Sequence, residues 1–159
     1  MFSLAKKRDQ KGFTIVELLI VIVVIGILAA LVVTTYGGIQ AKARDSKRQS
    51  DLQAVQTQIE AYYATNSFYP SLTDLNSASW RTANMKSLDA GALLDPSAQT
   101  STTPLSGTAA SSTNQKVYGY VATNAAGTTC TALDNTCSTY TLTAYLESSK
   151  TVYTKTALD

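Results

Sequence analysis

Residues 11–33, KGFTIVELLIVIVVIGILAALVV, decide the fold of this chain. From Phe13 to Val33 the sequence is apolar apart from one Thr, one Gly, a few small alanines and Glu17. A hydrocarbon core of about 30 Å needs roughly 20 helical residues, so this stretch predicts a helix long enough to span a membrane. A secretory signal peptide does not fit, because its apolar region runs only about 7 to 15 residues.

Glu17 is the ionisable group inside this stretch. The Phe, Ile, Leu and Val residues around it each favour membrane insertion by about 0.3 to 0.6 kcal/mol, against about 3 kcal/mol for one acid at the helix centre and less near its end. Glu17 therefore does not prevent insertion. One hypothesis is that its carboxylate snorkels to the lipid headgroups. The other starts from a chain cut after Gly12, in which Phe13 carries an α-ammonium of opposite charge to Glu17.

A basic flank completes a motif around the apolar stretch. Gly12, Phe13, Thr14 and Glu17 follow directly on the basic residues Lys6, Lys7, Arg8 and Lys11. This segment resembles the N-terminal segment of type IV pilins and the related pseudopilins. The resemblance implies that a prepilin peptidase cuts after Gly12, that Phe13 is N-methylated, and that Glu17 is used in filament assembly.

The resemblance also predicts how the chain is divided. Residues 1–12 are expected to be a leader peptide, 13–38 the membrane-spanning and assembly half of the N-terminal helix, and 39–159 a globular pilin domain that includes the amphipathic half of that helix. Thr34 stands where many pilins have a helix-kinking Pro, and the Gly37–Gly38 pair is the candidate for loosening the helix instead. The chain has no proline before Pro70, so one helix is expected from about Thr14 to Thr65.

The second half of this helix has an amphipathic pattern. Its apolar residues recur at helical spacing and predict one face that packs on a core: Leu52, Val55, Ile59, Tyr62 and Tyr63. The intervening charges are typical of a solvated helix face. A functional alternative is a basic patch for a membrane surface or DNA, made from Lys42, Arg44, Lys47 and Arg48.

The rest of the chain predicts a small α+β domain in which that helix covers an antiparallel sheet of about three to four strands. Alternating patterns at 117–123, 139–147 and 151–155 predict three strands, with Leu142 and Leu146 on the covered face. Ser71 and Asp74 have the spacing of a capping box before a short helix near 72–76, and helical turns are expected within 85–94. Residues 97–115, rich in Ser and Thr, are expected to form an exposed loop, with glycosylation as an open alternative.

Few residues here could do chemistry. The chain of 159 residues has no histidine and two cysteines, which excludes a histidine acid/base and a four-ligand zinc site within it. Cys130 and Cys137 are expected to form a disulfide, the alternative being two free thiols. Asp134 and Asn135 offer too few oxygens for a calcium loop. No catalytic residue, metal or cofactor is predicted, and the chain is not expected to be an enzyme.

The function expected from the sequence is therefore structural. The main hypothesis is a subunit of a type IV pilus or related filament, anchored in the inner (cytoplasmic) membrane before assembly and placed in an extracellular or periplasmic filament afterwards. Its partners would be prepilin peptidase, membrane lipid, the inner-membrane assembly machinery, and copies of itself and other pilins. The alternatives are a pseudopilin of a type II secretion system and a single-pass membrane-anchored binding or sensor domain. Without the leader, the chain has a net charge of −1, so no specific nucleic acid is predicted as a partner.

Overall fold

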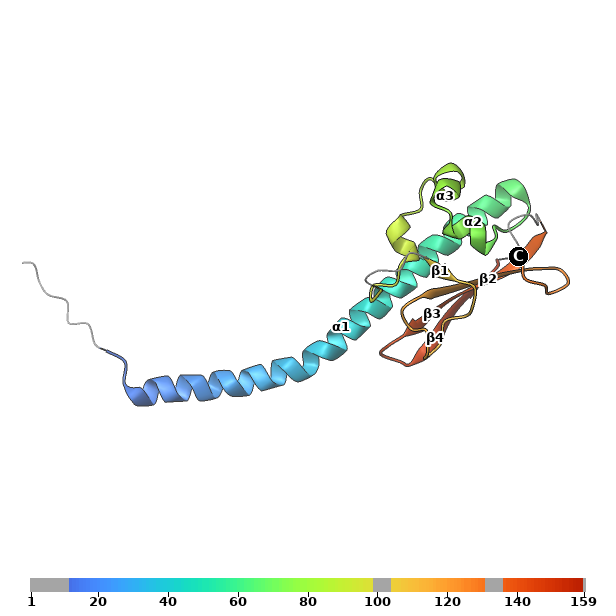
Figure 1. The fold of residues 1–159 in the computed structure, drawn as a ribbon. Coiled ribbons are helices and arrows are strands. Elements are labelled where there is room, and N and C mark those ends of the chain that lie inside the picture. Colours follow the sequence, from blue (N-terminus) through green and yellow to red (C-terminus); the bar gives the residue numbers. More distant parts are fainter. Residues whose placement is uncertain (1–11, 99–103, 131–135, 159) are drawn as a thin grey trace, which may run out of the picture. The chain divides into compact units, whose positions relative to one another are not determined.

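A computed structural model describes residues 12–98, 104–130 and 136–158 (Figure 1). The chain forms two compact units, Met1–Ile39 and Gln40–Asp159, and each is described by itself. The helix α1 (Ile15–Asn66) begins in the first unit and continues into the second. Its bounds lie within one residue of the helix expected from the sequence, and it passes through residues 34–38 without a break.

The C-terminal end of α1 is set by one residue in a left-handed conformation. Ser67 has a φ of 62°, and its backbone N–H donates a hydrogen bond of 2.7 Å to the carbonyl of Tyr63. This contact satisfies one of the carbonyl groups that every helix leaves unpaired at its end. The following Pro70 cannot continue a helix, so the chain reverses here as the sequence predicts.

The second unit contains a four-stranded sheet in the order β1-β2-β3-β4. The strands are β1 (Leu105–Ser106), β2 (Tyr118–Asn124), β3 (Cys137–Leu146) and β4 (Thr151–Thr156). Three of them are the strands expected from the alternating patterns. The expectation of an antiparallel sheet is wrong at one edge, where β1 pairs with β2 in parallel. Strand β1 is too short to show an alternating pattern.

Strand β1 also corrects the expectation of an exposed loop at 97–115. Leu105 is 1% exposed, and the side-chain amide of Asn76 binds both its backbone groups, accepting from its N–H at 2.9 Å and donating to its carbonyl at 3.0 Å. Asn76 is the last residue of α2 (Leu72–Asn76), whose capping box between Ser71 and Asp74 is confirmed. The sequence missed α3 (Ala78–Asn84), and only the 3-10 helix η1 (Ala90–Leu93) forms within 85–94.

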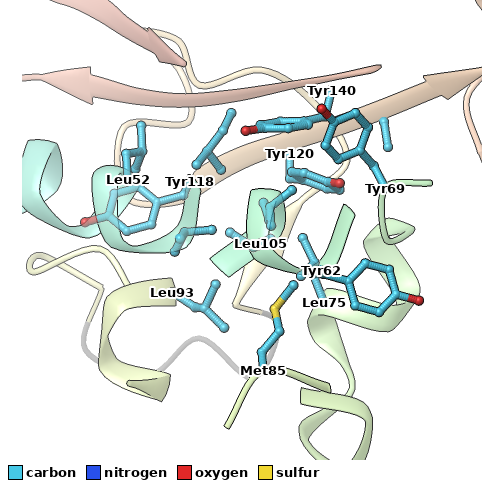
Figure 2. Close-up of a cluster of buried hydrophobic side chains, with 14 of the residues drawn as sticks. Leu52, Tyr62, Tyr69, Leu75, Met85, Leu93, Leu105, Tyr118, Tyr120 and Tyr140 are labelled. Atoms are coloured by element: carbon cyan, nitrogen blue, oxygen red, sulfur yellow. The ribbon is translucent and has the colours of Figure 1, made fainter. Parts of the chain in front are cut away.

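The core lies between α1 and one face of the sheet (Figure 2). Leu52, Val55 and Ile59 are fully buried in the same cluster as Leu142, which confirms the predicted helix stripe. Tyrosines fill much of the remaining volume, with Tyr120 and Tyr140 stacked at 5.7 Å between ring centroids. Their hydroxyl groups keep polar partners, since Tyr120 donates to the carbonyl of Pro70 and Tyr140 to Glu60.

The second face of the sheet is covered where β2 and β3 pair, which differs from the one-sided sheet expected from the sequence. Residues 107–110 cross Gly119 of β2 and Thr143 of β3, and the N–H of Ala110 donates to Thr143 Oγ1 at 2.8 Å. Thr143 is 3% exposed. A polar residue is therefore buried on the sheet face opposite the one that carries Leu142.

The C-terminal residues are held along α1 by a polar ladder, which we define as Gln53, Gln56 and Glu60. Gln53 accepts a hydrogen bond from the Lys155 ammonium, Gln56 donates to the carbonyl of Thr156, and Glu60 accepts from the N–H of Leu158. Glu60 also accepts from the hydroxyl groups of Tyr69 and Tyr140. The helix thus binds the chain at three successive points, two at the end of β4 and one just beyond it.

Candidate functional site

The N-terminal end of α1 holds Glu17 in a capping box. Glu17 Oε2 accepts hydrogen bonds from the backbone N–H of Thr14 at 2.8 Å and from its hydroxyl at 2.7 Å, while the Glu17 N–H donates to Thr14 Oγ1 at 3.2 Å. Two backbone donors that a helix leaves unpaired are satisfied reciprocally. This adds a third role for Glu17 to the two expected from the sequence. The Thr-x-x-Glu spacing was the signal that could have predicted it.

The same segment exposes its whole apolar surface. The large apolar side chains between Phe13 and Val33 range from 48% exposed at Val24 to 84% at Ile15. This is far more contiguous apolar surface than a soluble monomer presents to water. By length and composition α1 contains the one helix among the described residues that could cross a membrane. Gly12, Phe13 and Glu17 lie together, exposed, at its beginning.

A second notable site, in the globular unit, is a charge cluster that the sequence did not predict. Its centre is Arg48, whose side chain is 0% exposed. The guanidinium donates to Asp45 at 2.8 Å, to Asp95 at 2.7 and 3.0 Å, and to Glu147 at 2.5 Å. Arg44 binds Glu147 from the other side. We call these five residues the charge cluster.

The charge cluster joins three parts of the second unit. Asp95 follows η1, and Glu147 begins the turn between β3 and β4. Asp45 accepts from the backbone N–H groups of Glu147 and Ser148, both at 2.8 Å, and so caps that turn from the helix. The hypothesis of a four-residue basic surface patch is therefore wrong, because Arg48 is buried and Arg44 is paired. The sequence shows that Asp45 and Arg48 are three positions apart. It does not show that Asp95 and Glu147, which are distant in sequence, bind Arg48 in the interior.

Two carboxylates of the cluster, Glu147 and Asp45, have pKa values below their ordinary range. Hydrogen bonds from Arg44 and then from Arg48 lower the pKa of Glu147 to about 2. Burial opposes ionisation of Asp45, but hydrogen bonds from Ser148 and Glu147 outweigh it and lower its pKa. Both groups therefore stabilise the folded protein when they are ionised.

The pH dependence of stability follows from these directions. A depressed carboxylate contributes fully above its unfolded pKa of about 4, and its contribution is lost as pH falls towards the folded value. We expect the free energy of unfolding to fall between about pH 4.5 and pH 2. Glu147→Gln should show a shallower loss over that range, which denaturant titrations at a series of pH values would measure. Equal slopes for both proteins would contradict the role assigned to Glu147.

The two cysteines form a disulfide in the structure, with their Cα atoms 5.8 Å apart. Both sulfur-bearing residues are buried, Cys130 at 7% and Cys137 at 1% exposed. The N–H of Cys130 donates to Ala122, and the carbonyl of Cys137 accepts from Tyr69 just after the end of α1. Asp134 and Asn135, weighed above for a calcium loop, lie outside the described residues.

Comparison with known proteins bears on the N-terminal segment. Residues 7–33 match the model of the prokaryotic N-terminal methylation motif. This segment is a prepilin-type N-terminus. The resemblance to type IV pilins and pseudopilins is thereby confirmed where the sequence carried it.

The curated relatives that the chain matches include proteins named type II secretion system core protein G. That of Dickeya chrysanthemi is 44% identical over 64 residues, which cover 40% of this chain and 42% of the relative. That of Aeromonas hydrophila is 43% identical over 65 residues, covering 41% and 46%. That of Escherichia coli strain K12 is 43% identical over 61 residues, covering 38% and 42%.

These matches cover less than half of this chain and less than half of each of these relatives. No solved structure matches the chain. The comparisons therefore establish the prepilin-type N-terminus, and the α+β fold with its long helix comes from the structure itself.

Proposed function

We propose that the chain is a pseudopilin, a structural subunit of a membrane-anchored filament of the type II secretion kind. The observation that supports this most is the prepilin-type N-terminus at the start of a helix whose large apolar residues up to Val33 are all exposed. Such a surface needs either lipid or the helices of neighbouring subunits to cover it. The membrane would cover this surface with lipid before assembly, and the filament would cover it with neighbouring helices afterwards.

The sequence alone favours a subunit of a type IV pilus. The names of the relatives favour the alternative, a pseudopilin of a type II secretion system. The curated relatives carry the name type II secretion system core protein G. A pseudopilin and a pilin share the processing and assembly steps, so both predictions below apply to either. Deletion of the gene distinguishes the two functions. Loss of a pseudopilin leaves secreted proteins trapped in the periplasm, whereas loss of a pilus subunit abolishes surface fibres.

The assembly step that we propose pairs Glu17 with the α-ammonium of Phe13 on a neighbouring subunit. Cleavage after Gly12 would create that ammonium at the start of the apolar segment. Thr14 binds Oε2 of Glu17, and among the described residues only Thr14 donates to this carboxylate, so Oε1 can accept from another chain. Each charge is unfavourable in an apolar helix bundle when alone, and pairing compensates both.

Processing is the first prediction. We expect exported chains to begin at Phe13 and to carry one extra methyl group on the α-nitrogen, because residues 7–33 match the methylation motif. Intact-mass analysis of the exported protein measures both changes. A protein that still begins at Met1, or is cut beyond Ala30, contradicts the proposal and favours the simple membrane anchor.

The role of Glu17 is the second prediction. Glu17→Leu and Glu17→Gln should be inserted and cleaved normally but enter filaments poorly. Removing one partner of a buried ion pair costs about 3 to 5 kcal/mol, and about 1.4 kcal/mol corresponds to a factor of ten in affinity. The measurement compares the assembled fraction, after shearing or crosslinking, with the membrane pool.

Two variants separate the pairing role from the capping role. Glu17→Gln loses the charge but keeps a side chain that can complete a capping box. Thr14→Ala keeps the charge and loses the cap, which costs about 1 kcal/mol of helix stability. We therefore expect Thr14→Ala to assemble nearly as well as the unaltered protein. Poor assembly of Thr14→Ala together with normal assembly of Glu17→Gln would assign capping as the role of Glu17.

A further inference from the structure

The carboxylates of the second unit accept hydrogen bonds from groups of the same unit. Every acidic side chain that the structure describes between residues 40 and 158 accepts a hydrogen bond from the unit itself: Asp45, Asp51, Glu60, Asp74, Asp89, Asp95 and Glu147. Three of them are deeply buried, with the side chains of Asp45, Asp51 and Asp95 between 1% and 6% exposed. Three of the seven carboxylates, those of Asp45, Asp51 and Asp95, are therefore withdrawn from the surface.

Four lysines gather at one end of this unit, and we call them the lysine end: Lys42, Lys47, Lys116 and Lys150. Lys42 lies one helical turn before Asp45, which binds the turn between β3 and β4 that ends at Lys150. Lys116 precedes β2, and the pairing of Gly119 with Thr143 brings the start of β2 to the same end of the sheet as that turn. All four are exposed.

Three of these four lysines form no ion pair among the described residues, and the fourth is only partly neutralised. Lys47 binds Asp51 but its side chain remains 54% exposed. Lys42, Lys116 and Lys150 make no ion pair with any residue in the described ranges. Among the described residues, Lys42, Lys116 and Lys150 therefore carry unpaired charge at the surface, and Lys47 adds an ammonium that is paired but half-exposed.

The chain connects this end closely to the apolar segment. Lys42 lies nine positions after Val33 in α1, about 13 Å along a helix at 1.5 Å per residue. Headgroups extend about 5 to 8 Å beyond the hydrocarbon core on each side, and a lysine side chain reaches several ångströms further. Lys42, the lysine of this end nearest in sequence to the apolar segment, can therefore approach an anionic surface to within about one Debye length, roughly 8 Å at physiological salt.

We propose that the lysine end contacts the anionic phospholipid headgroups of the bilayer that the apolar segment occupies. The proposal rests on the membrane-anchored state in the proposed function and adds a contact to it. Clustered lysines next to a spanning helix are attracted to anionic lipid, and the attraction weakens as salt is added. This contact would hold the globular unit against the membrane until the subunit leaves it for a filament.

Lysine labelling in nanodiscs tests this contact. The full chain is placed, one copy per disc, in discs of zwitterionic phosphatidylcholine or of phosphatidylcholine with about 30% phosphatidylglycerol. It is then acetylated briefly with an uncharged reagent. Peptide mass spectrometry gives the labelling rate of each lysine. Lys86 serves as an internal control, because it is exposed and follows α3. Figure 1 shows α3 apart from the turn between β3 and β4.

We expect Lys42, Lys116 and Lys150 to be labelled at least about threefold more slowly in the anionic discs, with Lys86 unchanged. Raising the salt concentration to about 0.5 M should remove the difference. Equal rates in both discs at low salt overturn the proposal. Slowing in both lipids that appears only with several copies per disc also overturns it and assigns the lysine end to contact with another copy.

Failure of the membrane anchor would look different. A chain that does not enter discs of either composition contradicts both the anchored state and the lysine contact. A chain that enters both, with equal labelling, contradicts the lysine contact alone. Cleavage after Gly12 and the assembly behaviour of Glu17 variants are measured separately and are unaffected by this result.

Discussion

Arg48→Met is expected to lower the free energy of unfolding by about 3 to 5 kcal/mol. The substitution keeps most of the buried volume but removes the guanidinium that donates to Asp45, Asp95 and Glu147. Asp45 and Asp95 then remain in the interior without their cation, and a buried charge without a partner is more unfavourable than the original pair was favourable. Denaturant unfolding of the detergent-solubilised chain, followed by tyrosine circular dichroism, measures the loss.

Arg44→Met is the matched control for this prediction. Arg44 binds Glu147, the most exposed of the three carboxylates, and its own side chain is 33% exposed. Partly exposed ion pairs contribute about 0 to 1 kcal/mol. A double variant, Arg48→Met with Asp95→Asn, should recover part of the stability because it removes one of the unpaired charges. Equal losses for Arg48→Met and Arg44→Met would contradict the role of Arg48 as the centre of the charge cluster.

Gly119→Ala is the second substitution with a large expected effect. A Cβ atom at this position would lie 2.4 Å from the carbonyl oxygen of Thr108, 2.5 Å from Thr143 Oγ1 and 2.8 Å from Ala109 Cα. Two of these three atoms belong to backbone, so residues 107–110 must move away from the sheet. The hydrogen bond from Ala110 to Thr143 would be lost with that movement.

We expect Gly119→Ala to cost about 2 to 4 kcal/mol, since overpacking costs about 1 to 3 kcal/mol and an unsatisfied buried group about as much again. Gly107→Ala is the control, because its Cβ would meet only the end of the Leu72 side chain at 3.0 Å, which can shift. Thermal unfolding of the two variants compares them. A loss for Gly119→Ala no larger than that for Gly107→Ala would show that the crossing segment is not packed as tightly as described.

Local patterns predicted the elements that local physics determines. The alternation from Tyr140 to Leu146 predicts a strand, the stripe from Leu52 to Ile59 predicts a buried helix face, and Ser71 with Asp74 predicts a cap. Each depends on residues a few positions apart. The prepilin-type N-terminus was recognisable for the same reason, because its residues are consecutive.

Features that depend on distant residues could not be predicted in this way. Arg48 has the composition of a surface residue, and only Asp95 and Glu147, about 47 and 99 positions away, explain its burial. Strand β1 has two residues and exists because Asn76 and β2 bind it. The close packing at Gly119 and Thr143 has no local sequence signal, because it depends on Thr108 and Ala109, which cross the two strands from another part of the chain.

The polar ladder on α1 has a mechanical consequence for a subunit that is pulled through its helix. Gln53, Gln56 and Glu60 bind the end of β4 and the residues just beyond it at three points spaced along the helix axis. A force along that axis loads the three contacts together, in shear, whereas a force across it would break them one after another. Residues 155–158 therefore transmit a pulling force on the helix to the sheet through several hydrogen bonds at once.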